Sequence, residues 1–200
     1  MARIIYKKGC EGHNRLESIE GIEISLLNGQ RALIYPRYAE RILLKNAEYY
    51  GQEPDTEISA LKKTDNLRAT RKLDICGSPA VEFVSLFHSD EHGIFALPTL
   101  LAAMELQDQK KAIDALAETI EGADLLRDFT SFVWSCSRYN EDYGWIMNGY
   151  NGLSSYSGLH HSLLAVPTIL YRGQYDRRTK ISYRQEHRPV AESRADCEDV

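Results

Sequence analysis

Alternating apolar and polar residues predict a β-hairpin over residues 22–35. The segment reads IEISLLNGQRALIY, and its apolar residues alternate with polar ones before Asn28 and Gly29. An Asn-Gly pair favours the positive φ angles of a type I′ turn, which suits a tight hairpin loop. We therefore expect two antiparallel strands that meet at this pair and stop at Pro36.

Helical spacing of apolar residues predicts two helical regions. Residues 37–51 repeat apolar side chains on one face, and Gly51 can close the helix. Residues 94–126 carry the stronger pattern, because Pro98 and Thr99 can open a helix and an apolar stripe follows them. We expect helix in both regions.

Shorter apolar segments predict further strands at residues 81–87, 129–137, 143–147 and 163–172. Trp134 and Trp145 lie in two of these segments and are flanked by apolar residues, so we expect both indole rings to be buried. The order of strands, helices and strands indicates an α+β fold with an antiparallel sheet rather than alternating βαβ units.

Two polar segments complete the chain. Residues 52–79 contain Pro54, Gly77 and Pro79, and they predict an irregular excursion with one short element. Residues 173–200 are rich in charge and predict a tail that is poorly ordered or docked along the surface.

The composition excludes several classes of protein. The chain has 200 residues and a formal net charge of −5, which argues against a basic face for nucleic acid. No apolar run approaches the roughly 20 residues of a membrane-spanning helix. The N-terminus, MARIIYKKGC, places two basic residues after three apolar ones, the reverse of a signal peptide. We expect no nucleic-acid partner, no membrane and no export signal.

Residues 138–162 have the composition of a binding loop although apolar strands flank them. Fifteen of the 25 residues are Tyr, Ser, Gly or Asn. Tyrosine offers a large contact area with only two side-chain torsions to freeze, while Ser and Asn add adaptable hydrogen bonds. This mixture favours a binding surface. The alternative is a Gly- and Tyr-rich β-meander that binds nothing.

Four motifs in residues 94–172 resemble those of a known family. They are LPTLLAAMELQ at the start of a helix, the strand VWSCSRY, the strand GWI and the closing strand LAVPTILYR. Their order and spacing resemble the C-terminal half of a C-type lectin-like domain. The resemblance is closest to the variable proteins of diversity-generating retroelements and related lectin-like proteins of phage and gut bacteria. Residues 1–93 match only in a general way.

This resemblance implies a fold and its boundaries. We expect a single C-type lectin-like α+β domain over residues 1–172, with antiparallel sheets and two helices, followed by the charged tail 173–200. Because we expect no signal peptide and no transmembrane segment, we expect the chain to be cytoplasmic or assembled into a phage particle. A homo-oligomer is compatible with display. In such families a reverse transcriptase rewrites asparagine-type codons. A near-copy of the 134–172 coding segment in neighbouring DNA would identify the class.

The same resemblance implies a function and a set of site residues. The function is non-catalytic recognition of an unknown protein or glycan ligand through a hypervariable surface. Trp134, Ser135, Gly144, Trp145 and Gly152 would belong to the fixed scaffold. The implied ligand-binding residues are Tyr139, Asn140, Asp142, Tyr143, Asn148, Tyr150, Asn151, Ser154, Ser155, Tyr156, Ser157, His160 and His161.

Two departures from the wider lectin family limit what is carried over. The chain has no Glu-Pro-Asn or Trp-Asn-Asp motif of the kind that binds calcium with a sugar. Its four cysteines are far apart, form no Cys-x-x-Cys pair and are expected to be free thiols rather than the usual structural disulfides. We therefore expect no calcium-dependent sugar binding and no cofactor.

Four other interpretations remain open. Cys136 with His160 or His161 could form a nucleophilic pair, but alternation places the thiol in the core, where it is inert. The turn HSDEH at 88–92 could hold a metal ion, although adjacent ligands usually mean a solvated loop. Formylglycine-generating enzymes share the fold, but their paired cysteines have no counterpart here. A structural subunit of a phage tail or surface complex is the fourth alternative, with contacts through residues 100–120 or 52–79.

Overall fold

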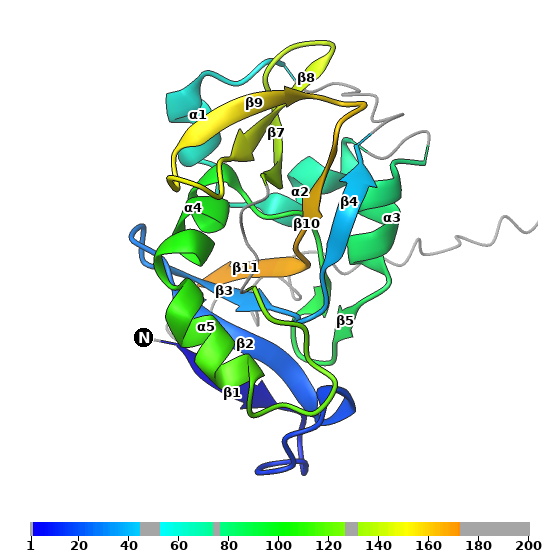
Figure 1. Cartoon of the computed structure of the whole chain (residues 1–200), viewed down its shortest axis with the longest axis vertical. Coiled ribbons are helices and arrows are strands. Elements are labelled where there is room, and N and C mark those ends of the chain that lie inside the picture. The colour runs from blue at the N-terminus through cyan, green and yellow to red at the C-terminus, as the bar shows by residue number, and fades with distance from the viewer. Residues whose placement is uncertain (1, 45–52, 74–76, 127–131, 173–200) are drawn as a thin grey trace, which may run out of the picture.

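The protein is a mixed α+β structure built on two main sheets. The computed structural model describes residues 2–44, 53–73, 77–126 and 132–172. The four-stranded sheet lies in the lower half of Figure 1, and the five-stranded sheet lies above it. In the described residues, no helix is both long and apolar enough to cross a membrane. The expected tail at 173–200 lies outside the described residues.

The first sheet joins strands from both ends of the described chain. Its order is β1-β2-β3-β11, and every neighbouring pair is antiparallel. The bounds are β1 (Arg3–Tyr6), β2 (Ile19–Ser25), β3 (Gln30–Ile34) and β11 (Thr168–Arg172). The expected hairpin over 22–35 is therefore confirmed as β2 and β3.

The turn of this hairpin differs from the expected type I′ turn. Gly29 has a φ of 80°, but Asn28 is not among the described residues with positive φ. The Gly29 N–H donates to the Leu26 carbonyl at 3.0 Å, which closes a type I turn followed by a left-handed glycine. Asn28 contributes through its side chain, because its Oδ1 accepts the Gln30 N–H at 3.0 Å.

The second sheet carries the segment that the sequence marks as a binding loop. Its order is β4-β10-β7-β8-β9. All its pairs are antiparallel except β10 with β7, which is parallel. The bounds are β4 (Ala39–Leu43), β7 (Val133–Arg138), β8 (Tyr143–Met147), β9 (Ser154–Gly158) and β10 (Ser162–Ala165). A small hairpin, β5 (His88–Ser89) and β6 (Gly93–Ile94), forms a separate two-stranded sheet.

The expected strands at 143–147 and 129–137 are confirmed as β8 and β7, with residues 129–131 outside the described ranges. The expected single strand at 163–172 is two strands in two different sheets. Pro167 lies between them and has no N–H to give to a ladder. The chain therefore leaves one sheet as β10 and enters the other as β11.

Two segments form a different type of element from the one that the sequence predicts. Residues 39–43, expected to be helical, form β4, because β10 pairs with them and Leu163 lies opposite Ile42. Residues 45–51 of that predicted helix fall outside the described residues. Residues 81–87, expected to be a strand, lie mostly in a helix that begins at Pro79. Its buried Ala80, Val81 and Val84 share one helical face.

The described residues contain five α-helices, where the resemblance implied two. The predicted helical region 94–126 holds two of them, and Thr99 caps the first by accepting the Ala102 N–H at 3.2 Å. The polar segment 52–79 holds two short helices instead of one element. The bounds are α1 (Glu57–Leu61), α2 (Asn66–Arg71), α3 (Pro79–Ser85), α4 (Leu100–Asp108) and α5 (Lys110–Ala117).

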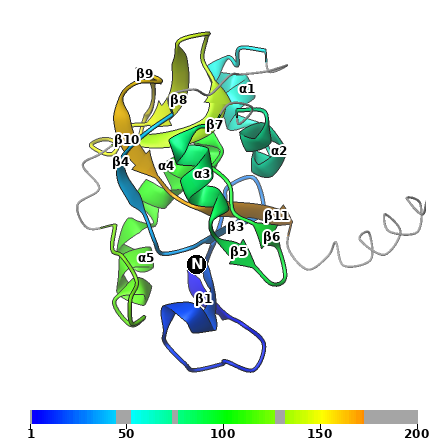
Figure 2. The same cartoon turned by 90° about the vertical axis from the view of Figure 1, so that its right-hand side faces the viewer.

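Helices cover both faces of the second sheet. Helices α2 and α3 contact β7, β4 and β10, while α4 contacts β7 and β8 (Figure 2). Trp134 and Ile146 belong to the core cluster with α2 and α3, and Trp145 packs with Leu100 of α4. Both indoles are buried, at 0% and 8% exposure, so that expectation is confirmed.

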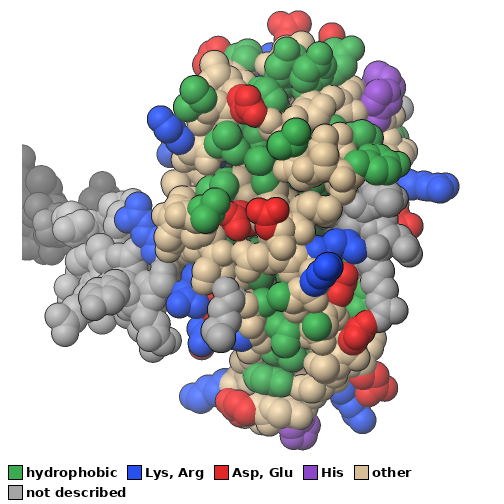
Figure 3. Space-filling model, turned by 60° about the vertical axis from the view of Figure 1, so that its left-hand side comes forward, with side chains coloured by type: hydrophobic (Ala, Val, Ile, Leu, Met, Phe, Trp, Pro, Cys, Tyr) green, Lys and Arg blue, Asp and Glu red, His purple; other side chains and the backbone are tan. Residues whose placement is uncertain are grey.

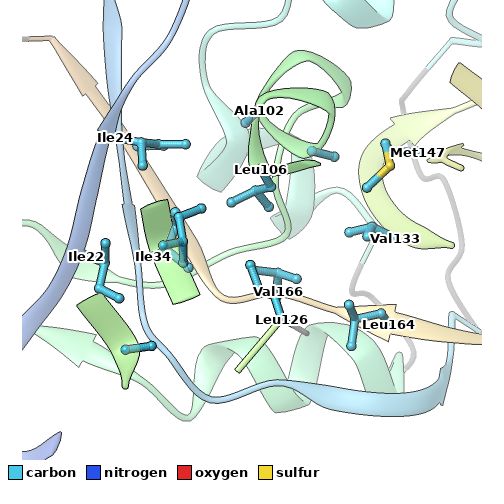
Figure 4. Packing of buried hydrophobic residues seen from close by; sticks show 14 of the residues in the cluster. Ile22, Ile24, Ile34, Ala102, Leu106, Leu126, Val133, Met147, Leu164 and Val166 are labelled. Atoms are coloured by element: carbon cyan, nitrogen blue, oxygen red, sulfur yellow. The ribbon is translucent and has the colours of Figure 1, made fainter. Parts of the chain in front are cut away.

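The largest core cluster connects the two sheets. Ala102 and Leu106 of α4 lie between the isoleucines of β2 and β3 and the second sheet's Val133 and Met147 (Figure 4). Leu106 and Val133 are fully buried. Strands β7 and β8 are therefore packed, through α4, against the first sheet.

Candidate functional site

The register of β8 and β9 places several tyrosines on one face. Trp145 lies directly opposite Tyr156, and Tyr143 lies opposite Gly158. Because directly opposed residues of antiparallel strands share a face, Tyr143 and Tyr156 are on the side of Trp145. This face is covered in part by α1 and α4, because Ala60 and Leu100 pack with Trp145.

Three tyrosines on this face form one aromatic cluster, which we call the aromatic surface: Tyr139, Tyr143 and Tyr156. The rings of Tyr139 and Tyr156 are stacked, with centroids 4.2 Å apart and planes 5° apart. Tyr143 meets Tyr156 edge-on at 5.8 Å. Tyr143 is 37% exposed and Tyr156 is 51% exposed. The surface therefore presents ordered rings to solvent.

Trp145 is the buried support of the aromatic surface. Tyr139 meets the indole edge-on at 5.1 Å. The indole Nε1 donates to the Asp55 carbonyl at 2.8 Å, and the Asp55 N–H donates to the Arg138 carbonyl at 2.9 Å. These bonds attach the segment before α1 to β7 and β8. The position of the tyrosines therefore depends on a contact between residues 90 positions apart.

The loop that carries Tyr139 is held by its own backbone. The N–H groups of Tyr139 and Asn140 both donate to the Tyr143 carbonyl, at 3.0 and 3.1 Å. Arg138 adds a bond from its Nε to the Asn140 carbonyl at 3.1 Å. A loop held by these bonds loses little further conformational entropy when it binds a partner.

The three asparagines of the stretch shape turns. The side-chain Oδ1 of Asn140 accepts the N–H of Asp142 at 3.0 Å. Asn148 and Asn151 accept the N–H groups two residues further on, at 2.9 and 3.0 Å. Each is an Asx turn, in which the side chain replaces a backbone turn bond. These amides therefore have a structural role that their sequence positions alone did not indicate.

This role predicts different effects for neighbouring substitutions. We expect Asn148→Ala to lower the free energy of unfolding by about 1 kcal/mol, because it removes a turn-forming hydrogen bond. Tyr150→Ala, two residues away, should stay within about ±0.5 kcal/mol, because that side chain is 72% exposed. Chemical denaturation of the two variants measures both values. Equal stability would contradict the structural role of Asn148.

The thirteen implied site residues occupy more than one surface. Asn148, Tyr150 and Asn151 lie in the turn between β8 and β9, at the other end of the strands from Tyr139. Five strand residues span about 16 Å. Tyr150 meets Phe132 edge-on at 6.2 Å, away from the aromatic surface. This turn is therefore a separate exposed region.

Other implied residues lie on the opposite face of β9. Ser155 and Ser157 alternate with Ser154 and Tyr156, so they point the other way. Ser157 is only 8% exposed, and its Oγ lies 2.8 Å from Nδ1 of His161. Ser157 therefore does not fit the expectation of a ligand contact. His160 and His161 are exposed in the turn that follows β9.

Acidic residues lie near both ends of β9. The Glu57 carboxylate, at the start of α1, accepts a hydrogen bond from the Ser154 hydroxyl. Glu141 and Asp142 are exposed in the loop before β8, and the Asp142 carbonyl accepts the Leu159 N–H at 3.0 Å. The nearby cation of Lys63 is paired with Asp55. Negative charge therefore borders the aromatic surface.

The face that includes α1 and β9 also carries apolar side chains. Hydrophobic side chains, among which tyrosine is counted, gather on the upper half of the face in Figure 3. Ile58 of α1 is 65% exposed, and Leu153, which precedes β9, is 58% exposed. Glu57 and Ile58 lie in the polar segment 52–79, which has no composition typical of a binding site. Their only local signal is Thr56, which caps α1 by accepting the Ser59 N–H.

The other candidate chemistries have less structural support. Cys136 is fully buried, and burial raises the pKa of its thiol to about 12, so the nucleophilic thiolate is disfavoured. At the 88–92 turn, Nδ1 of His88 lies 4.0 Å from Oδ1 of Asp90, and Nε2 of His92 lies 3.9 Å from Oε2 of Glu91. Within the described ranges, no group of three or more His, Cys, Asp or Glu residues could hold a metal ion.

Comparison with known proteins gives no assignment: no family model, no curated protein and no solved structure matches this chain.

Proposed function

We propose that this protein is a non-catalytic recognition domain that binds a protein or glycan ligand through the aromatic surface. The observation that carries the proposal is the stacked pair of Tyr139 and Tyr156, partly exposed above the buried Trp145. Exposed, ordered aromatic rings are typical of the residues that dominate binding energy at interfaces. Their support from strands and turns reduces the entropy lost on binding.

The proposal includes a C-type lectin-like class for the fold. Three of the four motifs behind the resemblance lie in the type of element that the resemblance implies for them. Thr99 caps a helix, Trp134 to Cys136 lie in β7, and Gly144 and Trp145 lie in β8. The closing segment is divided between β10 and β11. These placements support the class without depending on overall similarity.

A variable protein of a diversity-generating retroelement is the finer form of the proposal. Variation is tolerated where a side chain is exposed and holds no part of the backbone. Tyr143, Tyr150 and Tyr156 meet the first condition, whereas Asn140 and Asn148 bond to their own turns. The tyrosine positions are therefore better suited to variation than the asparagine positions.

A binding experiment tests the proposed surface. A library of displayed random peptides and a glycan array would be probed with the wild-type protein and with Tyr139→Ala and Tyr156→Ala. We expect each variant to lose at least about tenfold in affinity for any ligand that the wild type recovers, because exposed aromatic anchors dominate such interfaces. Tyr150→Ala is the matched control and should bind like the wild type. Unchanged binding by both surface variants would overturn the proposal.

A further inference from the structure

The β11 edge of the first sheet is already occupied. Thr168 exchanges two backbone hydrogen bonds with Ala96, at 2.9 and 3.0 Å. The Leu170 N–H donates to Oδ1 of Asn66 at 3.2 Å, and the Asn66 amide donates to the Thr168 carbonyl at 2.8 Å. The outward groups of Thr168 and the outward N–H of Leu170 therefore have partners within the protein.

Two more edges carry features that oppose strand addition. Strand β1 begins at the charged Arg3 and has an irregular register between Ile5 and Tyr6. Strand β4 exposes Glu40 and Arg41, and Arg41 has a left-handed φ of 56°. Bulges and edge charges are the usual means of preventing another strand from pairing.

The β9 edge carries none of these features. Its sequence, SSYSG, has no charge and no proline, and its five residues pair with β8 in an unbroken register. Among the described elements, β9 has extensive contacts only with β8. An edge strand of this kind is a template for another strand.

The hydrogen-bond pattern identifies which β9 groups face outward. The Tyr143 carbonyl accepts N–H groups from the β7 side, whereas the Asn148 N–H donates across the hairpin to the Leu153 carbonyl at 2.8 Å. Backbone direction alternates along antiparallel strands, so Ser155 and Ser157 bond to β8. The N–H and C=O groups of Ser154 and Tyr156 therefore point away from the sheet. The far end is closed, because the Gly158 carbonyl accepts the His161 N–H at 2.9 Å.

We propose that β9 binds its partner by strand addition, and that the partner is an extended peptide segment with basic side chains at alternate positions. This inference rests on the proposed function and names the partner of that site. A residue opposite Tyr156 on the added strand would share its face and lie within reach of the aromatic surface. A Lys or Arg there would meet the tyrosine rings and the Glu57 carboxylate.

Charge selects this occupant over a second copy of the chain. Pairing of two β9 edges about a two-fold axis would bring Glu57, Glu141 and Asp142 of both copies to one interface. Like charges at an interface oppose association, whereas a basic peptide complements them.

Hydrogen exchange of individual amides, followed by NMR, tests the inference. The probe is a seven-residue peptide of alternating Arg and Val, and its control is the same peptide with Glu in place of Arg. We expect the Ser154 and Tyr156 amides to exchange rapidly in the free protein and to become protected by the basic peptide. The Ser155 and Ser157 amides, which bond to β8, should be protected throughout.

A pair of variants tests the backbone contact separately from the side chains. Ser154→Pro removes an outward N–H at the first residue of β9, a position where a strand accepts proline. Ser154→Ala removes the hydroxyl but keeps the N–H. We expect the proline variant to bind the basic peptide about five- to tenfold more weakly than the alanine variant, the value of one hydrogen bond.

Three results would overturn the inference. The first is that the basic peptide does not protect the Ser154 and Tyr156 amides, and the second is that the acidic peptide binds equally well. The third is that these amides become protected without peptide as the protein concentration rises, because the protein dimerises. If the edge amides stay unprotected while Tyr139→Ala and Tyr156→Ala still lose ligand, strand addition fails and the proposed function stands. If those two variants keep full binding, the proposed function itself fails.

Discussion

Replacing Trp134 with alanine is expected to lower the free energy of unfolding by about 3–5 kcal/mol. The indole is fully buried on β7, and its Nε1 donates to the Ile42 carbonyl of β4 at 3.0 Å. Truncation removes the packing with α2 and α3 and leaves that carbonyl without its donor. Chemical denaturation followed by circular dichroism measures the loss.

Tyr150→Ala is the matched control for this result, because it truncates an aromatic side chain that is 72% exposed. It should change stability by no more than about 0.5 kcal/mol. A Trp134→Ala protein that unfolds at the same denaturant concentration as Tyr150→Ala would show that β7 does not pack as described.

Replacing Glu23 with glutamine is expected to cost about 1–3 kcal/mol at neutral pH. The side chain is 3% exposed and accepts hydrogen bonds from Arg3 at 2.7 Å, from Arg31 and from Tyr171. These residues belong to β1, β2, β3 and β11, so the carboxylate connects all four strands of the first sheet. Glutamine keeps the shape but removes the charge that strengthens these bonds. Because Arg3 is 61% exposed, solvent reduces the contribution of that pair.

The effect of this substitution should depend on pH. Burial alone would raise the pKa of Glu23, but the hydrogen bonds from Arg3 and Tyr171 and the Arg3 charge lower it below its ordinary 4.5. A lowered pKa means that the ionised group stabilises the fold fully above about pH 4.5, and that this contribution is lost as the pH falls through the folded-state value. The stability gap between wild type and Glu23→Gln should therefore shrink below about pH 4.5.

Glu40→Gln is the control for the pH effect, because Glu40 is exposed on the edge strand β4. It should alter stability by no more than about 0.5 kcal/mol at any pH in this range. A gap for Glu23→Gln that persists unchanged in acid would contradict a stabilising role for the ionised carboxylate.

Local signals in the sequence were enough to predict the elements whose stability is largely local. The β2–β3 hairpin follows from alternation and a glycine that adopts a φ of 80°, and α4 begins where Thr99 can cap it. Strands β7 and β8 carry tryptophans among apolar residues, and their burial was expected for that reason. Composition also separated residues 138–162 from the apolar strands around them.

The wrong expectations occur where tertiary contacts outweigh local preference. The sequence of residues 39–43 suits a helix, but these residues complete a sheet because β10 offers them a partner strand. The segment around Val81 has the composition of a strand, yet the face formed by Ala80 and Val84 packs against the second sheet as a helix. A short apolar segment does not specify its own element, because the energy that decides comes from the surface it meets.

The candidate site shows the same division. Its amino-acid types could be recognised in the sequence, because tyrosine-rich stretches have a distinctive composition. Which tyrosines lie in one cluster was decided by register: the pairing of β8 with β9 places Tyr156 opposite Trp145 and leaves Ser157 on the other face. The bond from Trp145 to Asp55 then fixes the support, across 90 positions of sequence. Composition and spacing carry no information about such pairings, because a strand's partner and the direction of its outward backbone groups exist only once the sheet has formed.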